Sequence, residues 1–427
     1  MSDTTARSKP KEGKNVESTE RQPSWVLVPW VIAFLMGLFS VSASLCALPR
    51  SSIRIPRTDN NSLSPNCPTP EPHAQSIVCF VNYVSAVPGF TKAHIPTHLC
   101  HRVVLCCLSD ITENAVGVAM RQAAELRAHV KSAATYMGFG GPDLDYSHLS
   151  TWFSSGARRV VDVIVRTVRR AGYTGGAAVM IADSRHVDKL GSLQTFSAML
   201  LQDLRRAAGH YSLVLLVPAQ PGTESRLFSP HMLALDGMVP IMLSHVTEEY
   251  NADLKFATCS TPTNAARFVA GAQSVSLEAA FVKARDDCEG SAWPVLERKI
   301  GFSFSLAWSE FLQRDLEGSR DAGIPAMYQG PVSYSSVCKK NLGIHRRTFR
   351  DYRTDCQVIS DGGQRWYSGL GEEASRFLRT HFALTTIGVF DIEFEDFNGT
   401  CRGLRYPQLQ ALHDVLRQIW CKNTLNS

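Results

Sequence analysis

The segments ARRVVDVIVRTVRRAG (157–172) and AAVMIA (177–182) stand four residues apart and together indicate the class of fold. In the first segment, apolar side chains recur every three or four positions, which is typical of a helix that packs on one face. The second segment is a short, continuous apolar run with the length of a strand that is buried on both sides. A helix that leads directly into a buried strand predicts an α/β protein with parallel strands.

The same alternation continues along the chain in both directions. Helical patterns at 113–129, 193–208 and 405–420 separate further apolar runs. Eight strand-like runs and their order predict a closed parallel (β/α)8 barrel. The interval between the seventh and eighth runs is too long for one helix, so we expect a small inserted subdomain at about 309–370. The eight runs are 76–84, 102–108, 131–138, 177–182, 211–219, 239–244, 300–308 and 385–394.

Composition narrows the class of protein. The chain has 427 residues, of which 44% are hydrophobic, so it can bury a large core and is not disordered throughout. Its net charge of +5, from 44 basic and 39 acidic residues, is too dilute to indicate a nucleic-acid partner. The 12 cysteines suit a large domain in an oxidising compartment. Their spacing relative to the 13 histidines indicates no zinc site, and we expect no metal and no cofactor.

The N-terminal region contains a long uncharged stretch, WVLVPWVIAFLMGLFSVSASLCAL (25–48). A helix of this length covers about 36 Å, enough to cross a hydrocarbon core of about 30 Å. We therefore expect a transmembrane signal anchor. Five basic residues before it and three after it favour a cytoplasmic N-terminus. The alternative is a secreted protein whose signal peptide is cleaved after Ala43 or Ala47.

The segments around the predicted span are polar. Residues 1–24 are expected to form a disordered cytoplasmic tail, and residues 49–75, rich in Ser, Pro and Asn, a disordered stalk. The barrel domain, 76–427, would then lie on the extracellular or lumenal side. Asn60 in the stalk and Asn398 near the C-terminus each begin an acceptor sequence for N-glycosylation.

Several fragments, in one order along 76–421, resemble family 18 glycoside hydrolases, the chitinases and chitinase-like proteins. The resemblance implies a TIM barrel with an α+β insertion between strands 7 and 8. It also implies two disulfides, Cys79 with Cys100 and Cys338 with Cys401. The fragments are CFVNYVSAVPGFTKAHIPTHLCHRVVL (79–105), GYTGGAAVMIADS (172–184), LDGMVPIMLSH (235–245), KIGFSFSLAW (299–308), AGIPAMYQGPVSYSSVC (322–338) and IGVFDIEFEDFNGTC (387–401).

The catalytic carboxylates of that family are missing from the matching positions. Family 18 enzymes protonate the glycosidic oxygen with a glutamic acid, while the acetamido group of the sugar attacks the anomeric carbon. Their fourth-strand motif, D-x-x-D-x-D-x-E, reads here Thr174, Ala177, Val179 and Ile181. We expect the alternate residues of this strand to face the barrel interior. An isoleucine at the acid position removes general-acid catalysis, which is commonly worth about 10²–10⁴-fold.

Other parts of the family's sugar site are also altered. The tyrosine and aspartate of the sixth-strand motif, M-x-Y-D, are replaced by Ser244 and His245. The third-strand motif reads Tyr136-Met137-Gly138-Phe139, and Phe390 stands where the family has the tryptophan that floors the sugar site. The acidic cluster that follows it is expected to lie at a solvated edge of the barrel. Its members are Asp391, Glu393, Glu395 and Asp396.

These observations favour a membrane-anchored pseudoenzyme that could bind chitin or other N-acetylglucosamine-containing glycans. Aromatic side chains are the platforms on which sugars stack, and Phe390, Tyr136, Trp152 and Trp308 are the candidates. Each of them is equally compatible with core packing. Two alternatives stay open: an adhesion or signalling module that binds no sugar, and a weak or altered family 18 glycosidase. The sequence does not identify a protein partner.

Overall fold

The structure is a computed structural model, and its described residues all belong to one compact unit, 63–427. The tail, span and stalk predicted for 1–75 lie outside the described residues. The described residues are 76–83, 85–108, 112–141, 156–181, 190–218, 229–243, 255–256, 293–313, 325–339, 347–351, 356–360, 364–370, 386–401 and 403–425.

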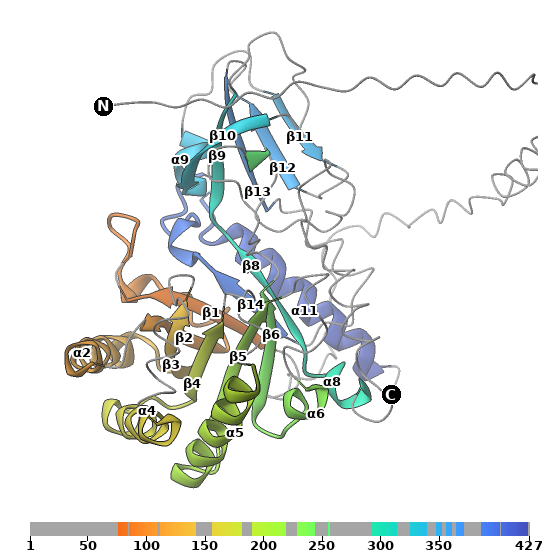
Figure 1. Ribbon diagram of the computed structural model, residues 1–427. Helices are drawn as coiled ribbons and strands as arrows, with labels where there is room; N and C mark the ends of the chain where they lie inside the picture. Colours follow the sequence, from red (N-terminus) through yellow and green to blue (C-terminus); the bar gives the residue numbers. More distant parts are fainter. Residues whose placement is uncertain are drawn as a thin grey trace, which may run out of the picture. The chain divides into compact units, whose positions relative to one another are not determined.

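Eight parallel strands close into a barrel, in the order β1-β14-β8-β6-β5-β4-β3-β2 (Figure 1). This confirms the predicted (β/α)8 architecture. Each of the eight apolar runs in the sequence overlaps one of these strands, and β3, β4 and β6 extend one to three residues beyond their runs. The strands are β1 (Ser76–Asn82), β2 (Arg102–Leu108), β3 (Ala134–Gly141), β4 (Gly176–Ile181), β5 (Ser212–Pro218), β6 (Met238–Leu243), β8 (Gly301–Ser305) and β14 (Thr386–Phe390).

Helices follow several of the strands, and residue types that favour helix ends stand at the start of one of them and at the end of another. Helix α2 is capped by Thr112, whose side-chain oxygen accepts a hydrogen bond from the backbone N–H of Ala115. Helix α4 ends at Ala171 and is followed by Gly172, whose φ of 72° lies in the left-handed region that glycine adopts at the lowest cost. The helices are α2 (Glu113–His129), α4 (Ala157–Ala171), α5 (Leu190–Ala207), α6 (Pro230–Leu233), α8 (Trp293–Leu296) and α11 (Pro407–Leu425).

Side chains of the barrel strands alternate between two separate cores. The outer core lies between strands and helices, where for example Leu105 and Phe139 of the strands join Ile164 of α4. The inner core fills the barrel, and all of its members are uncharged. They are Val78, Phe80, Val104, Cys106, Tyr136, Ala178, Met180, Val214, Leu216, Ile241, Leu243 and Phe390. The barrel is thus a packed core, as expected for eight strands.

The long interval between β8 and β14 contains most of a six-stranded sheet, in the order β11-β12-β13-β9-β10-β7. The sheet also takes in β7, which precedes β8 and lies outside the predicted interval 309–370. Short two-residue strands of this kind carry no sequence pattern of their own. The elements are β7 (Lys255–Phe256), β9 (Trp308–Gln313), β10 (Pro325–Val332), α9 (Tyr334–Lys339), β11 (Arg347–Asp351), β12 (Cys356–Ser360) and β13 (Arg365–Leu370).

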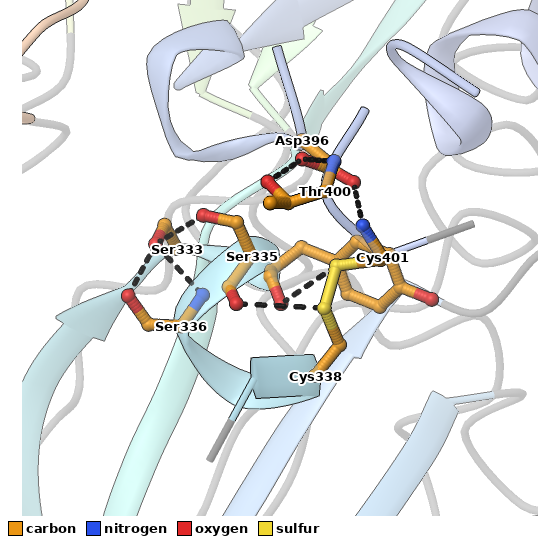
Figure 2. Close-up of a disulfide and its surroundings, with 8 residues drawn as sticks. Ser333, Ser335, Ser336, Cys338, Asp396, Thr400 and Cys401 are labelled. Carbon is orange, nitrogen blue, oxygen red and sulfur yellow. Dashed lines mark hydrogen bonds between the residues drawn. A yellow bond between two sulfur atoms is a disulfide. The ribbon is translucent and has the colours of Figure 1, made fainter. Parts of the chain in front are cut away.

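Both predicted disulfides are present. Cys79 in β1 is bonded to Cys100, just before β2, and Cys338 in α9 is bonded to Cys401, after β14 (Figure 2). Disulfides between distant segments are typical of proteins that fold in an oxidising compartment. Within the described part of the chain, no helix has both the length and the apolarity needed to cross a membrane.

Candidate functional site

The carboxyl ends of the barrel strands form the mouth, which is where (β/α)8 proteins place their sites. Four described groups meet at this end. Asn82 ends β1, Ser305 ends β8, and Phe390 ends β14, with Asp391 directly after it. The single turn η5 (Ile392–Phe394) follows and brings Glu393 back to the same end of β1.

Phe390 is the aromatic residue at the mouth. Its ring is stacked on that of Phe80, with a centroid separation of 4.1 Å and an interplanar angle of 4°. The side chain keeps 8% of its surface exposed. One face of the ring is therefore covered by Phe80, and what remains for a ligand is a small part of the ring.

Asp391 adopts an unusual backbone conformation. Its φ of 59° lies in the left-handed region, which costs free energy for a residue with a side chain and is common at functional sites. Its Oδ2 accepts a hydrogen bond of 2.5 Å from Oγ of Ser305. Burial raises the pKa of this carboxyl, and the Ser305 hydroxyl offsets part of the rise. Burial and then the charge of Asp391 also raise the pKa of Tyr328 on β10.

Glu393 is fully buried beside Asp391. Its Oε1 accepts a hydrogen bond of 2.7 Å from Nδ2 of Asn82, while its Oε2 has no hydrogen-bond partner among the described residues. Burial raises the pKa of this carboxyl, and the positive charge of Lys92 opposes the rise. The ammonium of Lys92 itself donates to the backbone oxygens of Asn82 and Tyr83.

The other two members of the acidic cluster, Glu395 and Asp396, accept hydrogen bonds from the chain that follows β14. Oε2 of Glu395 accepts a hydrogen bond of 3.1 Å from the backbone N–H of Leu409 in α11, and burial raises the pKa of Glu395 to about 8. The carboxylate of Asp396 accepts hydrogen bonds from Thr400 and from the backbone N–H of Cys401 (Figure 2).

The expectation of a solvated edge for this cluster is therefore wrong. Glu393, Glu395 and Asp396 have no exposed surface, and Asp391 is half-buried. The reason is that the chain turns back across the barrel after β14. Its backbone N–H groups need acceptors once they are buried, and the carboxylates supply them.

In the fourth strand, β4, the side chains that point into the barrel are not the ones expected from the sequence. Ala177 and Val179 belong to the outer core, whereas Ala178 and Met180 belong to the inner core. The strand begins at Gly176, which has a φ of 127° and pairs with the inward-facing Tyr136. The expectation that Ala177 and Val179 point into the barrel is thus wrong.

A glycine pair at the start of β4 allows this phase. A Cβ at Gly175 would overlap the ring of Tyr136, so this position requires a glycine. In either phase, the fourth strand offers the described barrel interior no carboxyl group. Ile181 ends β4, and its side chain lies outside the described part of the structure, as do the whole of Ser244, His245 and Trp152.

Two other predicted site residues lie near the amino ends of strands, and a third is buried in the inserted sheet. Tyr136 is buried at the base of the barrel, with its hydroxyl 2.8 Å from Oγ of Ser212. Thr174 lies in the turn before β4, and its Oγ1 accepts a hydrogen bond of 3.0 Å from the backbone N–H of Thr135. Trp308 is fully buried in the core of the six-stranded sheet, against Tyr334.

The described structure aligns over about 80% of the chain with a known group of solved structures. The chain has the fold of the family 18 glycoside hydrolases. The immunomodulatory active chitinase TsES1 from Trichuris suis aligns with a TM-score of 0.65 at 15% identity, covering 80% of this chain and 100% of that one.

Two further structures show the functional range of this fold. Human YKL-39, described as a pseudo-chitinase with retained chitooligosaccharide binding, aligns with a TM-score of 0.65 at 15% identity, covering 80% of this chain and 100% of its own. The Group IV chitinase of Ostrinia furnacalis, in complex with allosamidin, aligns with a TM-score of 0.67 at 13% identity, covering 81% and 99%. No protein-family model and no curated protein sequence matches the chain. At these identities the similarity establishes the fold, and function has to be argued from the residues.

Proposed function

We propose that this chain is a non-catalytic, chitinase-like protein whose barrel mouth binds N-acetylglucosamine-containing glycans. The observation that supports the proposal most is the chemistry of the barrel interior. None of the eight described barrel strands contains an aspartate or glutamate, and the fourth strand contributes Ala178 and Met180 to the interior. A glycosidase of this family needs an acid there to protonate the leaving oxygen. The residue that matches the acid is Ile181 in the predicted phase and Ala182 in the observed one, and neither holds a carboxyl.

A sugar would contact the mouth through Phe390 and the polar groups around it. The exposed part of the Phe390 ring can stack on a sugar, and the half-buried carboxyl of Asp391 can accept hydrogen bonds from its hydroxyls. Because Phe80 covers one face of that ring, we expect weaker binding than in a cleft with several free aromatic platforms. Trp152 is a second candidate platform. We leave Tyr136 and Trp308 out of the proposed site because Tyr136 is buried near the amino end of β3 and Trp308 has no exposed surface.

One observation favours a weak glycosidase as a second candidate. Asp391 stands at the mouth, and burial raises its pKa, as is common for a general acid. Its carboxyl accepts a hydrogen bond from Ser305. The strand before it, β14, carries no further acidic residues of the kind that support a catalytic acid in this family. We therefore rank this candidate below the binding protein.

We further propose that the barrel domain is extracellular or lumenal and is tethered by the helix predicted at 25–48. The long-range disulfides support the compartment. Asn60 and Asn398 are the proposed glycosylation sites, and Asn398 is exposed in a turn after β14. Oγ1 of Thr400, the third residue of that acceptor sequence, donates to Asp396 (Figure 2).

The experiment is a calorimetric titration of the full-length protein with chitotetraose. Phe390→Leu keeps an apolar side chain at the mouth and removes the aromatic ring, so it should weaken binding about tenfold. Phe311→Leu makes the same change in the insert, where Phe311 is buried, and should leave the affinity unchanged. Saturable binding that Phe390→Leu does not alter would move the site away from the mouth. An absence of binding would favour the adhesion or signalling module.

A further inference from the structure

A cavity lies at the opposite end of the barrel from the mouth. Its volume is about 590 Å³, within the range of small-molecule sites. Its wall includes residues at or just before the amino ends of β2, β3, β4, β5, β6 and β14. We call it the basal pocket. The proposed function does not use it.

The basal pocket is strongly cationic. Arg102, Arg205, Arg298 and Lys299 line it, against one carboxylate, that of Asp236. These five residues come from β2, α5 and the loops before β6 and β8, so the fold gathers them from distant parts of the sequence. A set of like charges around one concave surface is unfavourable by itself and creates a positive potential that attracts anions.

The single carboxylate offsets only part of the charge of these four cations. Oδ2 of Asp236 pairs with Nη1 of Arg205 at 2.6 Å, and the Asp236 side chain is 87% exposed, so the pair is well solvated. The ammonium of Lys299 donates to the backbone oxygens of Ala234 and Leu235, at 2.9 and 3.1 Å. Those carbonyls fix the lysine in place without compensating its charge.

The remaining wall supplies neutral hydrogen-bonding groups. Tyr136 and Ser212 form the floor, with their hydroxyl oxygens 2.8 Å apart, and Thr174 stands beside them. His101 is a neutral member, because burial lowers its pKa and its Nδ1 accepts a hydrogen bond from the backbone N–H of Ile77. Cations around a floor of hydroxyls suit the oxygen atoms of a phosphate or sulfate group, which accept several hydrogen bonds at once.

The packed interior separates this pocket from the mouth. Above Tyr136 the inner core is made of apolar side chains such as Ala178, Met180 and Leu216. A ligand in the basal pocket therefore has no path through the barrel to Phe390. A neutral sugar carries no charge with which the four cations could pair, so the mouth and the basal pocket of the barrel should select different ligands.

We propose that the basal pocket binds a small polyanion carrying phosphate or sulfate groups. Arginine is suited to this chemistry because its planar guanidinium can bind two oxygens of one group. Phosphate esters and sulfate esters share the chemistry, and the experiment distinguishes them.

The test is calorimetry of the full-length protein with inositol hexakisphosphate and, in a second arm, with inositol hexasulfate. Saturable binding at one site is expected for at least one probe, and the stronger arm identifies the preferred ester. The double variant Arg205→Gln/Arg298→Gln should lower that affinity about tenfold or more. The thermal unfolding midpoint of each variant, measured in parallel, shows that it is folded.

The matched control is Arg159→Gln/Arg170→Gln, which removes two exposed charges from α4, away from the pocket. It should leave the affinity within about twofold. Equal losses in both double variants would mean that only net charge attracts the probe, and this would overturn the proposal. Failure of both probes to bind the unaltered protein would overturn it as well. A Phe390→Leu variant should bind the polyanion as the unaltered protein does.

Discussion

At the level of single residues, the carboxyl groups behind β14 explain more of the structure than their sequence pattern indicates. Acidic residues close together usually lie in water, and the sequence gives no sign that Glu393, Glu395 and Asp396 are buried. They are buried because the returning chain leaves backbone N–H groups that need acceptors, as Leu409 and Cys401 do. That requirement arises from the tertiary path of the chain, which local sequence does not encode.

Glu395 should make the stability of the protein depend on pH. Its native pKa of about 8 lies above the ordinary value of 4.5, so the native state keeps a proton that the unfolded chain releases between these values. The free energy of unfolding should therefore fall as the pH rises from about 4.5 to 8. One pKa unit corresponds to about 1.4 kcal/mol, so the fall attributable to Glu395 can reach about 5 kcal/mol.

Glu395→Gln keeps a neutral acceptor for Leu409 and should flatten this dependence. The measurement is urea unfolding of both proteins at pH 5 and pH 8. Glu297→Gln, at an exposed position, is the control and should keep the slope of the unaltered protein. Equal slopes for Glu395→Gln and the unaltered protein would contradict the argument.

At the level of secondary-structure elements, the sequence predicts the barrel well because buried parallel strands are continuous apolar runs. Helix α2 and strand β2 have the predicted bounds, 113–129 and 102–108. The prediction of which β4 side chains face inward was wrong, because a shift of one residue exchanges the inner and outer faces of a strand. Only pairing with Tyr136 of β3, a non-local contact, determines which face is the inner one. The two-residue β7 was missed for a similar reason, since its partner β10 makes it a strand.

The Cys338–Cys401 disulfide should stabilise the protein by connecting α9 of the insert to the segment after β14 (Figure 2). For a sequence separation of 63 residues, the chain-entropy estimate is about 4 kcal/mol. Cys338→Ala/Cys401→Ala should lower the free energy of unfolding by about this amount, as measured by urea unfolding. Adding a reductant to that double variant tests the remaining disulfides. Unchanged stability of the double variant would mean that the bond does not form in solution.

At the level of the whole molecule, the barrel has two chemically different ends. The mouth carries Phe390 with carboxyl groups, and the base carries four cations around hydroxyls. Strand β1 begins at Ser76, at the base, so the chain before it joins the barrel at that end. A tether at 25–48 would therefore be connected to the base and not to the mouth.

The proposed tether predicts that the full-length protein, expressed in animal cells, stays with the membrane after alkaline carbonate extraction. Deletion of 25–48 should release it. If the signal were instead cleaved, the secreted protein would begin just after Ala43 or Ala47, which sequencing of its N-terminus would show. Enzymatic removal of N-glycans should lower the mass, and Asn398→Gln should remove part of that change if the barrel domain is lumenal.

The most direct test of the central claim is the release of a fluorescent leaving group from a chitobiose conjugate by the full-length protein, with an active family 18 chitinase as the positive control. Because none of the eight described barrel strands contains an acidic residue, we predict a rate equal to that without protein, under conditions where chitotetraose binds. A rate above that background, lost in Asp391→Asn, would show that the mouth supplies its own acid and would contradict the account.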